Sequence, residues 1–247
     1  MTKNSKLCLK NKRIINKNRD TITAMMSGTE TVKRINNLNW LRHEISYVEP
    51  STLFYLPKKE QQLDMDFTCN KNLGEAYDYI ITHPDTMIDE YEICRIHSTL
   101  CNGTYLEPVG GHYRDSNKIL DITVNGERFY APEAYDIPLN MTKIIYNLRN
   151  YKISPLNKAF NIHYQLIALQ PFEDFNKRTA RLIMNWVLIQ HGYSPIVFNC
   201  PSDKQNYKKA IALCASGDIK AYTAYMTSCM VRTENSIINV LQKSRTL

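Results

Sequence analysis

Glycine is scarce in this sequence, with eight residues among 247. Because sandwiches and barrels need many tight turns, which glycine builds best, this scarcity favours helices. Long apolar runs are also absent: none approaches the roughly 20 residues that span a bilayer, so no membrane partner is expected. Apolar residues still make up 43% of the chain. That is enough for a sizeable core in one domain with extensions, or at most in two small domains.

Paired cysteines and a secretion signal are lacking as well. The seven cysteines show no CxxC pair and no disulfide-like spacing, and the N-terminus has no apolar core of the kind that signal peptides carry. An odd cysteine count in such a chain indicates free thiols in a reducing compartment, so we expect a cytoplasmic protein. A zinc site is not expected, because His163 and His191 have no cysteines at ligand spacing.

The positive charge is confined to one end of the chain. Of the net charge of +7, residues 1–20 hold +6, from seven lysines and arginines against Asp20 alone. The remaining body is nearly neutral, so no nucleic acid is expected as a partner. We expect residues 1–20 to form a disordered, solvated basic tail. A nuclear-import or anionic-surface role for this tail stays open, and with it a nuclear location.

The apolar periodicity after the tail is mostly helical. Helices are predicted at Thr31–Arg42, in two segments within 72–102 of which the second is Met87–Leu100, and then at Met141–Asn150, Leu156–Leu169, Thr179–Gln190, Asp203–Ser216, Ile219–Val231 and within 232–247. Residues 182–189 are apolar nearly all round, which is typical of the buried centre of a bundle. The predicted fold class is an all-α helical bundle.

One segment, Ile119–Tyr130, breaks the helical period. Its Asn125-Gly126 pair lies between two β-prone runs, and a type I′ turn needs positive φ at both of these central residues. A β-hairpin that protrudes from the bundle is therefore predicted. Two roles stay open for it, a structural arm or a flap that faces a substrate.

The clearest chemistry lies in a short loop that leads into the apolar helix. Residues 170–181 read Gln-Pro-Phe-Glu-Asp-Phe-Asn-Lys-Arg-Thr-Ala-Arg. A helix N-terminus attracts anions, and Arg178 and Arg181 share a helix face on which both could hold phosphates. Asp174 is the nearby acid suited to Mg2+, and Phe172 is expected to anchor the loop. The alternative is an amphipathic helix start with solvent-facing charges.

These residues resemble the signature loop of the Fic (Fido) family, His-x-Phe-x-(Asp/Glu)-Gly-Asn-(Gly/Lys)-Arg-x-x-Arg. The likeness extends upstream to 159–164 and downstream to 180–185 and 191–195, and Gly-His-Tyr-Arg at 111–114 with the hairpin is similar to the family's flap. It covers roughly residues 20–230. The domain boundaries we expect are 1–20 for the tail, 21–60 for an N-terminal extension, 61–231 for the Fic domain and 232–247 for a C-terminal helix.

The resemblance implies a Fic-type bundle that transfers a phosphate-containing group, usually AMP from ATP, to a hydroxyl of a target protein. By position, Asp174 would bind Mg2+. The nucleotide would be held by Phe175, Asn176, Lys177, Arg178 and, at its terminal phosphate, Arg181. The hairpin would bind the target as an extended segment by strand addition, through Ile122, Thr123 and Val124. The oligomeric state is not specified.

Three positions in the loop depart from the family pattern. Gln170 stands where the family has the histidine that acts as general base, and losing a positioned base typically costs about 10²–10⁴-fold in rate. Phe175 replaces a glycine, where a bulky side chain would narrow the nucleotide site or exclude positive φ. Lys177 replaces the second glycine, as in the family's Doc-like kinase branch, which transfers the γ-phosphate.

A fourth departure lies near the N-terminus. Residues 23–29, Thr-Ala-Met-Met-Ser-Gly-Thr, resemble a degraded form of the family's inhibitory motif Ser/Thr-x-x-x-Glu-Gly/Asn, in which Ser27 replaces the glutamate. That glutamate would pair with Arg181 and block the γ-phosphate site. Neither His163 nor His191 is placed to act as the base. His163 lies about 10 Å before Gln170 along its helix, and we expect it to be a packed structural residue. His191 lies at the far end of the next helix.

The residues therefore leave three functions open, with ATP and Mg2+ as the expected ligands. The favoured one is a Fic-type AMP transferase that is weak or inactive because of Gln170. The second is a non-catalytic protein that binds nucleotide and a protein segment. The third, suggested by Lys177, is a Doc-like phosphoryl transferase.

Overall fold

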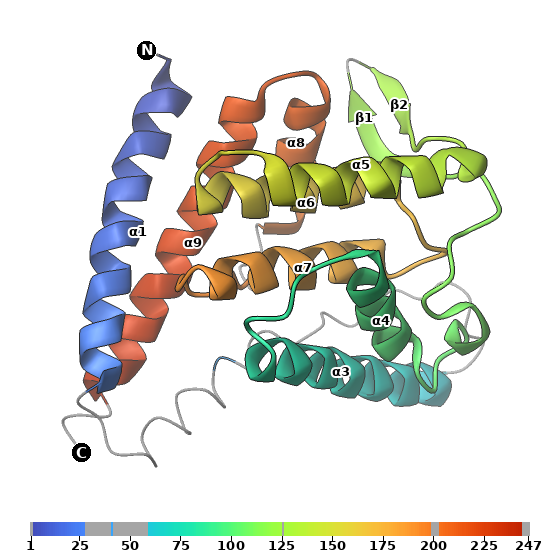
Figure 1. The fold of residues 1–247 in the computed structure, drawn as a ribbon, viewed down its shortest axis with the longest axis horizontal. Coiled ribbons are helices and arrows are strands. Elements are labelled where there is room, and N and C mark those ends of the chain that lie inside the picture. The colour runs from blue at the N-terminus through green and yellow to red at the C-terminus, as the bar shows by residue number, and fades with distance from the viewer. Residues whose placement is uncertain (1, 28–40, 42–58, 125, 199–202, 244–247) are drawn as a thin grey trace.

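The computed structural model describes residues 2–27, 41, 59–124, 126–198 and 203–243. Its elements are, in chain order, α1 (Lys3–Ser27), α3 (Lys59–Thr82), α4 (Glu90–Cys101), η1 (Glu107–Val109), β1 (Ile119–Val124), β2 (Glu127–Tyr130), η2 (Ala134–Asp136), α5 (Ile137–Asn150), α6 (Pro155–Leu169), α7 (Asn176–Gln190), α8 (Asp203–Ala215) and α9 (Ile219–Lys243). The predicted all-α bundle with one hairpin is confirmed (Figure 1).

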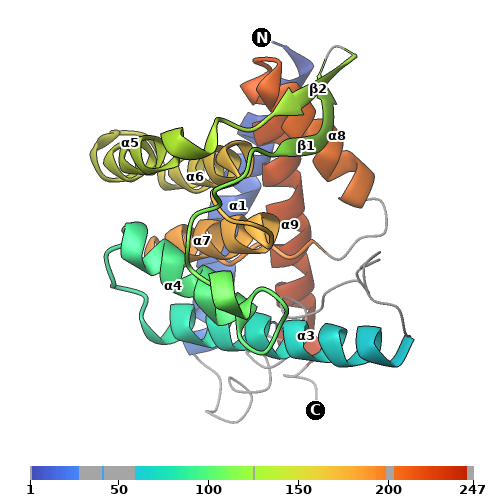
Figure 2. The same cartoon turned by 90° about the vertical axis from the view of Figure 1, so that its right-hand side faces the viewer.

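Helix α7 is the centre of the bundle. It lies between a layer formed by α5 and α6 and a layer formed by α3 and α4 (Figures 1 and 2). Ile183, Met184 and Trp186 have no exposed surface, and the Trp186 indole Nε1 donates to the His83 carbonyl at 3.1 Å. The apolar run within 182–189 therefore does what its pattern predicts: it is covered on all sides.

The predicted disordered tail is wrong, because residues 3–27 form helix α1, which packs along α9 (Figure 1). The buried face of α1 recurs at intervals of three and four residues and consists of Asn11, Ile15, Asn18, Ile22 and Met25. The Asn11 amide nitrogen donates to the Ser228 hydroxyl at 2.9 Å across this seam. A low mean hydropathy hid this stripe, because lysines and asparagines surround it.

The last helix of the structure also differs from the two helices expected at the C-terminal end. Helix α9 continues without a break from Ile219 to Lys243, so the separate helix expected within 232–247 is the second half of α9. In the middle of the chain, α3 begins at Lys59, well before the expected start at 72. The helix predicted at Thr31–Arg42 lies outside the described residues, apart from the buried Leu41.

The predicted hairpin is confirmed as an antiparallel pair of strands. Thr123 lies opposite Arg128, and Val124 lies opposite Glu127. Gly126 has a φ of +86°, the positive value that a tight hairpin turn requires. Strand β1 lies beside α8, and the hairpin protrudes from the end of the bundle at which α6 passes into α7 (Figure 2).

Candidate functional site

The site is built on the loop between α6 and α7, which two left-handed residues delimit. Gln170 ends α6 with a φ of +48°, and Phe175 precedes α7 with a φ of +55°. The prediction that a bulky residue at 175 would exclude positive φ is wrong. A left-handed residue other than glycine costs about 1–2 kcal/mol, and the ring of Phe175 offsets this cost because it is 6% exposed and packed in the core.

Asn176 closes this loop from the inside. Its Oδ1 accepts from the Phe172 backbone N–H at 2.9 Å, and its Nδ2 donates to the Phe172 carbonyl at 2.8 Å. The Phe172 ring has no exposed surface and stacks on the His97 imidazole at 3.8 Å between ring centroids. The predicted anchoring by Phe172 is confirmed. Asn176 is 4% exposed and bonds the loop itself, so its contact with a phosphate stays a prediction.

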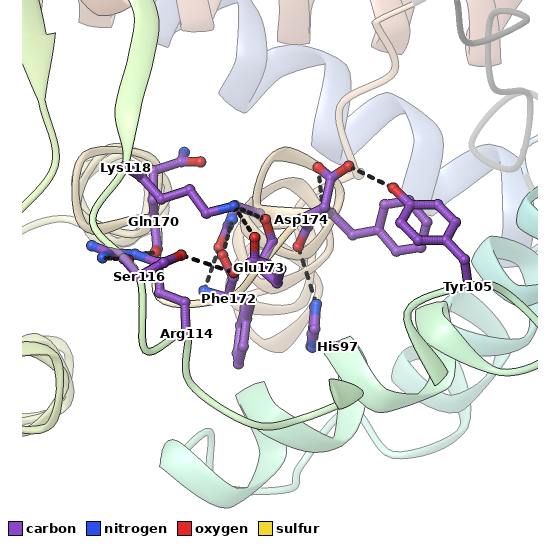
Figure 3. Close-up of polar contacts among 11 residues, drawn as sticks. His97, Tyr105, Arg114, Ser116, Lys118, Gln170, Phe172, Glu173 and Asp174 are labelled. Carbon is purple, nitrogen blue, oxygen red and sulfur yellow. Dashed lines mark hydrogen bonds and ion pairs between the residues drawn. The ribbon is translucent and has the colours of Figure 1, made fainter. Parts of the chain in front are cut away.

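Asp174 carries an exposed carboxylate on a well-held backbone (Figure 3). Oδ1 accepts from the Phe175 N–H at 2.7 Å, and Oδ2 accepts from the Tyr105 hydroxyl at 3.2 Å. Mg2+ is commonly held by one or two carboxylates together with substrate phosphates and waters. The described residues contain no group of three His, Cys, Asp or Glu that could hold a metal ion, so this single carboxylate fits an ion that the phosphates also ligate.

The buried His97 holds the backbone of Asp174 from the core side. The Gly111 N–H donates to His97 Nδ1 at 2.9 Å, so the proton is on Nε2, which donates to the Asp174 carbonyl at 3.1 Å. Burial lowers the pKa of His97 to about 4. The imidazole is therefore neutral near pH 7, and its tautomer is fixed by its two contacts.

The two arginines rest on aromatic rings. The Arg178 guanidinium carbon lies 4.4 Å from the centroid of the Phe175 ring. The Arg181 guanidinium carbon lies 4.6 Å from the Phe198 ring and 4.7 Å from the Tyr207 ring. Arg181 Nε is buried without a hydrogen-bond partner. Buried donors of this kind are rare and need an explanation, and an anion bound at this end of α7 would supply the acceptor.

The Gln170 amide is bonded within its own helix. Its Nε2 donates to the Ile167 carbonyl at 2.8 Å, so the side chain is turned back onto the last turn of α6. An amide has no useful basicity, and because this one is already hydrogen-bonded it is not free to turn toward a reacting hydroxyl. Lys177, also predicted to hold nucleotide, is the second residue of α7 and has an exposed side chain.

Arg114 ties the hairpin to the loop (Figure 3). Its side chain is buried and donates to backbone carbonyls on both sides of the hairpin, namely Ser116 at 2.5 Å and Pro132 at 2.6 Å, and to Gln170 at 2.7 Å and Leu169 at 3.3 Å at the end of α6. Its backbone N–H donates to Pro171 at 2.9 Å. The base of the hairpin and the signature loop are therefore one hydrogen-bonded unit.

A second link joins the hairpin to the loop through Glu173. Lys118 Nζ donates to the Glu173 Oε1 at 2.6 Å and to its carbonyl at 2.5 Å, and the Ser116 hydroxyl donates to Oε2 at 3.2 Å. The hydrogen bond from Lys118 lowers the pKa of Glu173. A carboxylate held in this way is a poor substitute for the missing base, because lowering its pKa reduces its basicity.

The remaining predicted positions are placed less completely. Ile122, Thr123 and Val124 lie on β1, as predicted, and Thr123 is exposed. Ser27 is the last residue of α1, and residues 28 and 29 of the inhibitory alignment lie outside the described residues. Strand addition at β1 and the inhibitory position both stay predictions.

Sequence reasoning missed several residues of this site. They are His97, Tyr105, Lys118 and Glu173, together with the role of Arg114. One signal was present for His97: it lies on the apolar face of α4 with Ile93, Ile96 and Leu100, all buried. A histidine on such a face needs hydrogen-bond partners inside the protein.

Together, a buried central helix with two arginines near its N-terminus and a hairpin joined to the preceding loop define the Fic class of fold. A solved structure of a Fic domain containing signaling protein from Bacteroides thetaiotaomicron matches with a TM-score of 0.73 at 20% identity, over 92% of this chain and 98% of that chain. Residues 87–188 match the model of the Fic/DOC family, so the resemblance to this family is confirmed over that part of the chain.

Two further comparisons concern activity and ligand. The chain is 27% identical over 166 residues to "Protein adenylyltransferase Fic" of Aedes aegypti, a match that covers 65% of this chain and 32% of that protein. The chain thus spans about a third of this curated relative. A structure of the BepC effector protein from Bartonella tribocorum, with bound AMPPNP, matches with a TM-score of 0.50 at 16% identity, over 77% of this chain and 96% of that chain.

The neutral His97 predicts a loss of stability in acid. Its folded pKa of about 4 lies below the ordinary 6.5, so between these values the unfolded chain binds a proton that the folded chain does not. The free energy of unfolding should therefore fall as the pH drops from about 6.5 toward 4, by at most about 1.4 kcal/mol per unit for this group. Urea unfolding at pH 7 and pH 5 measures it. His97→Gln, which keeps a donor for Asp174, should show a shallower decline, and an unchanged decline would contradict the assignment.

The bonds of Arg114 predict that this residue holds the hairpin. In Arg114→Lys, amide hydrogen exchange in β1 and β2 should become at least about tenfold faster, because losing a charged hydrogen bond costs about 1.5–3 kcal/mol. Exchange in α7 should change much less. The exposed Arg128 on β2 supplies the matched control, Arg128→Lys. Equal hairpin protection in Arg114→Lys and in the control would show that Arg114 does not anchor the hairpin.

Proposed function

We propose that the site binds ATP with Mg2+ and is a weak or inactive form of a Fic-type AMP transferase. The observation that carries this proposal is the buried Arg181 Nε, which lacks an acceptor near the N-terminal end of the central helix. Arg178 lies on the same helix, and Asp174 lies in the loop that precedes it. The adenylyltransferase relative, as its name describes it, and the AMPPNP in the Bartonella structure support the choice of ligand.

The chain's own residues account for binding and orientation. Arg181 and Arg178 would hold the phosphates with charged donors, and the rings beneath them limit how far the guanidinium groups move. Asp174 would hold Mg2+, which neutralises part of the phosphate charge when it is bound. The Tyr105 hydroxyl now on Asp174 Oδ2 would give way to the ion.

The chemical step is where the site is deficient. The oxygen of a target hydroxyl would attack the α-phosphorus, the bond to the β-phosphate oxygen would break, and pyrophosphate would leave. The hydroxyl proton must go to a base, and Gln170 offers only an amide that is already bonded to Ile167. Water would have to accept the proton, so we expect a rate about 10²–10⁴-fold below that of a site with a positioned base.

The target would bind as an extended segment along β1, next to the loop. Arg114 and Lys118 join the base of the hairpin to the loop that carries Asp174. An added strand would therefore hold the target's side chains at a fixed position relative to the phosphates. The same Gln170 contact favours the second candidate function, a protein that binds nucleotide and target without transfer.

Restoring the base tests the proposal. Gln170→His should increase transfer of label from [α-32P]ATP to protein by about 10²–10⁴-fold over the wild-type chain, measured in a lysate to which the purified chain is added. Gln170→Ala is the matched control and should stay at the wild-type level. Without any gain in Gln170→His, the site would not be a weakened transferase.

The same assay separates the alternatives. A Doc-like enzyme would transfer label from [γ-32P]ATP instead, and Lys177→Gly should reduce that transfer. Binding of Mg-ATP with no transfer of either label by Gln170→His would support the non-catalytic function. A chain that does not bind Mg-ATP at all would contradict both the transferase and the binder.

A further inference from the structure

A buried chain of hydrogen bonds ends at Tyr207, whose ring lies against the Arg181 guanidinium. His163, in the middle of α6, has no exposed surface. Its Nδ1 lies 2.7 Å from the Tyr222 hydroxyl, and its Nε2 lies 2.8 Å from the Tyr207 hydroxyl. The Tyr222 hydroxyl in turn lies 2.9 Å from the Phe160 carbonyl. The mechanism above does not use these groups.

The direction of every bond in this chain is determined. A carbonyl only accepts, so Tyr222 donates to Phe160, and its oxygen accepts the proton carried by His163 Nδ1. Burial and the nearby charge of Arg181 lower the pKa of His163 to about 3, so the ring is neutral. Its Nε2 then has only a lone pair to offer, and the Tyr207 hydroxyl must donate to it.

The consequence reaches Arg181. With its proton committed to His163, the Tyr207 oxygen faces its other neighbours as an acceptor. Burial raises the pKa of Tyr207, and the charge of Arg181 together with a hydrogen bond from Arg181 opposes that rise. The guanidinium lies over the rings of Tyr207 and Phe198, and its Nε is left without a partner.

We infer that His163 is a positioning residue that acts through Tyr207 to hold the Arg181 guanidinium with its Nε free for the terminal phosphate of the nucleotide. The inference rests on the proposed function. Its consequence is a preference for nucleoside triphosphate over monophosphate, because only the longer ligand offers an oxygen to Arg181. The neutral Nδ1–H tautomer of His163 is what makes Tyr207 an acceptor on the side of Arg181.

Removing the Tyr207 hydroxyl tests this inference by nucleotide affinity. Titration calorimetry with Mg2+ should show that Tyr207→Phe weakens ATP binding by about tenfold, a typical loss for one charged hydrogen bond. AMP binding should change by less than about twofold. Tyr164, half-buried against Tyr222 and outside the chain of bonds, supplies the control Tyr164→Phe, for which both affinities should stay the same.

A double-mutant cycle shows whether the effect passes through Arg181. In an Arg181→Met background, Tyr207→Phe should no longer change the affinity for ATP. His163→Gln, whose side-chain oxygen can still accept from Tyr207, should keep most of the ATP preference that His163→Met loses. An equal loss of ATP and AMP affinity in Tyr207→Phe would indicate a merely structural role and overturn the inference.

The free protein offers a test that does not depend on the nucleotide. A 15N spectrum of the histidine side chains should show His163 protonated at Nδ1 and not at Nε2 at pH 7. The opposite tautomer would overturn the inference while leaving the proposed function intact. A wild-type chain that binds neither ATP nor AMP, but shows the expected tautomer, would instead contradict the proposed function.

Discussion

The site depends on one pair of hydrogen bonds, those between the Asn176 carboxamide and the backbone of Phe172. They close the turn between α6 and α7. This turn begins at Gln170 and ends at Phe175, and both residues have a left-handed backbone. With the turn closed, the Phe172 ring is buried against His97. Asp174 then lies at the surface, and the first turn of α7 lies beside it. Without this closure, neither the Asp174 carboxylate nor the two arginines would have a fixed position.

Two neutral histidines support the charged groups of the site from the core. His97 donates from Nε2 to the backbone of Asp174, and His163 fixes the Tyr207 hydroxyl beside Arg181. In each case burial holds the pKa low, and the second ring nitrogen is bonded, so the tautomer is set. Charged groups held by neutral, oriented neighbours need little reorganisation when a ligand arrives. As a consequence, the free energy of unfolding falls in acid, because these imidazoles bind protons in the unfolded chain but not in the folded one.

The sequence was sufficient where the period was strong and local. The buried α7, the hairpin at Asn125-Gly126 and the short loop that leads into α7 follow from spacing and residue type alone. Composition failed for α1, because Ile15 and Ile22 form a stripe that a low mean hydropathy conceals and that only contact with α9 reveals. The roles of His97, Arg114 and Lys118 could not be predicted, because their partners lie about 55 or more residues away in the chain and meet them only in the fold. Local strain alone predicts that Phe175 excludes a positive φ, but the packing of its ring in the core outweighs this strain.

The proposed function separates two properties of a Fic-type AMP transferase, a site for a charged nucleotide and a base for the hydroxyl that attacks it. The first would rest on Asp174, Arg178 and Arg181, and the second would be missing at Gln170, whose amide bonds the last turn of α6. A crystal structure of the wild-type chain grown with ATP and Mg2+ tests this account most directly. The account predicts a phosphate oxygen within hydrogen-bond distance of Arg181 Nε and the ion on Asp174, with the Tyr105 hydroxyl displaced. Nucleotide bound elsewhere, or an Arg181 Nε that stays without a partner beside a bound nucleotide, would contradict it.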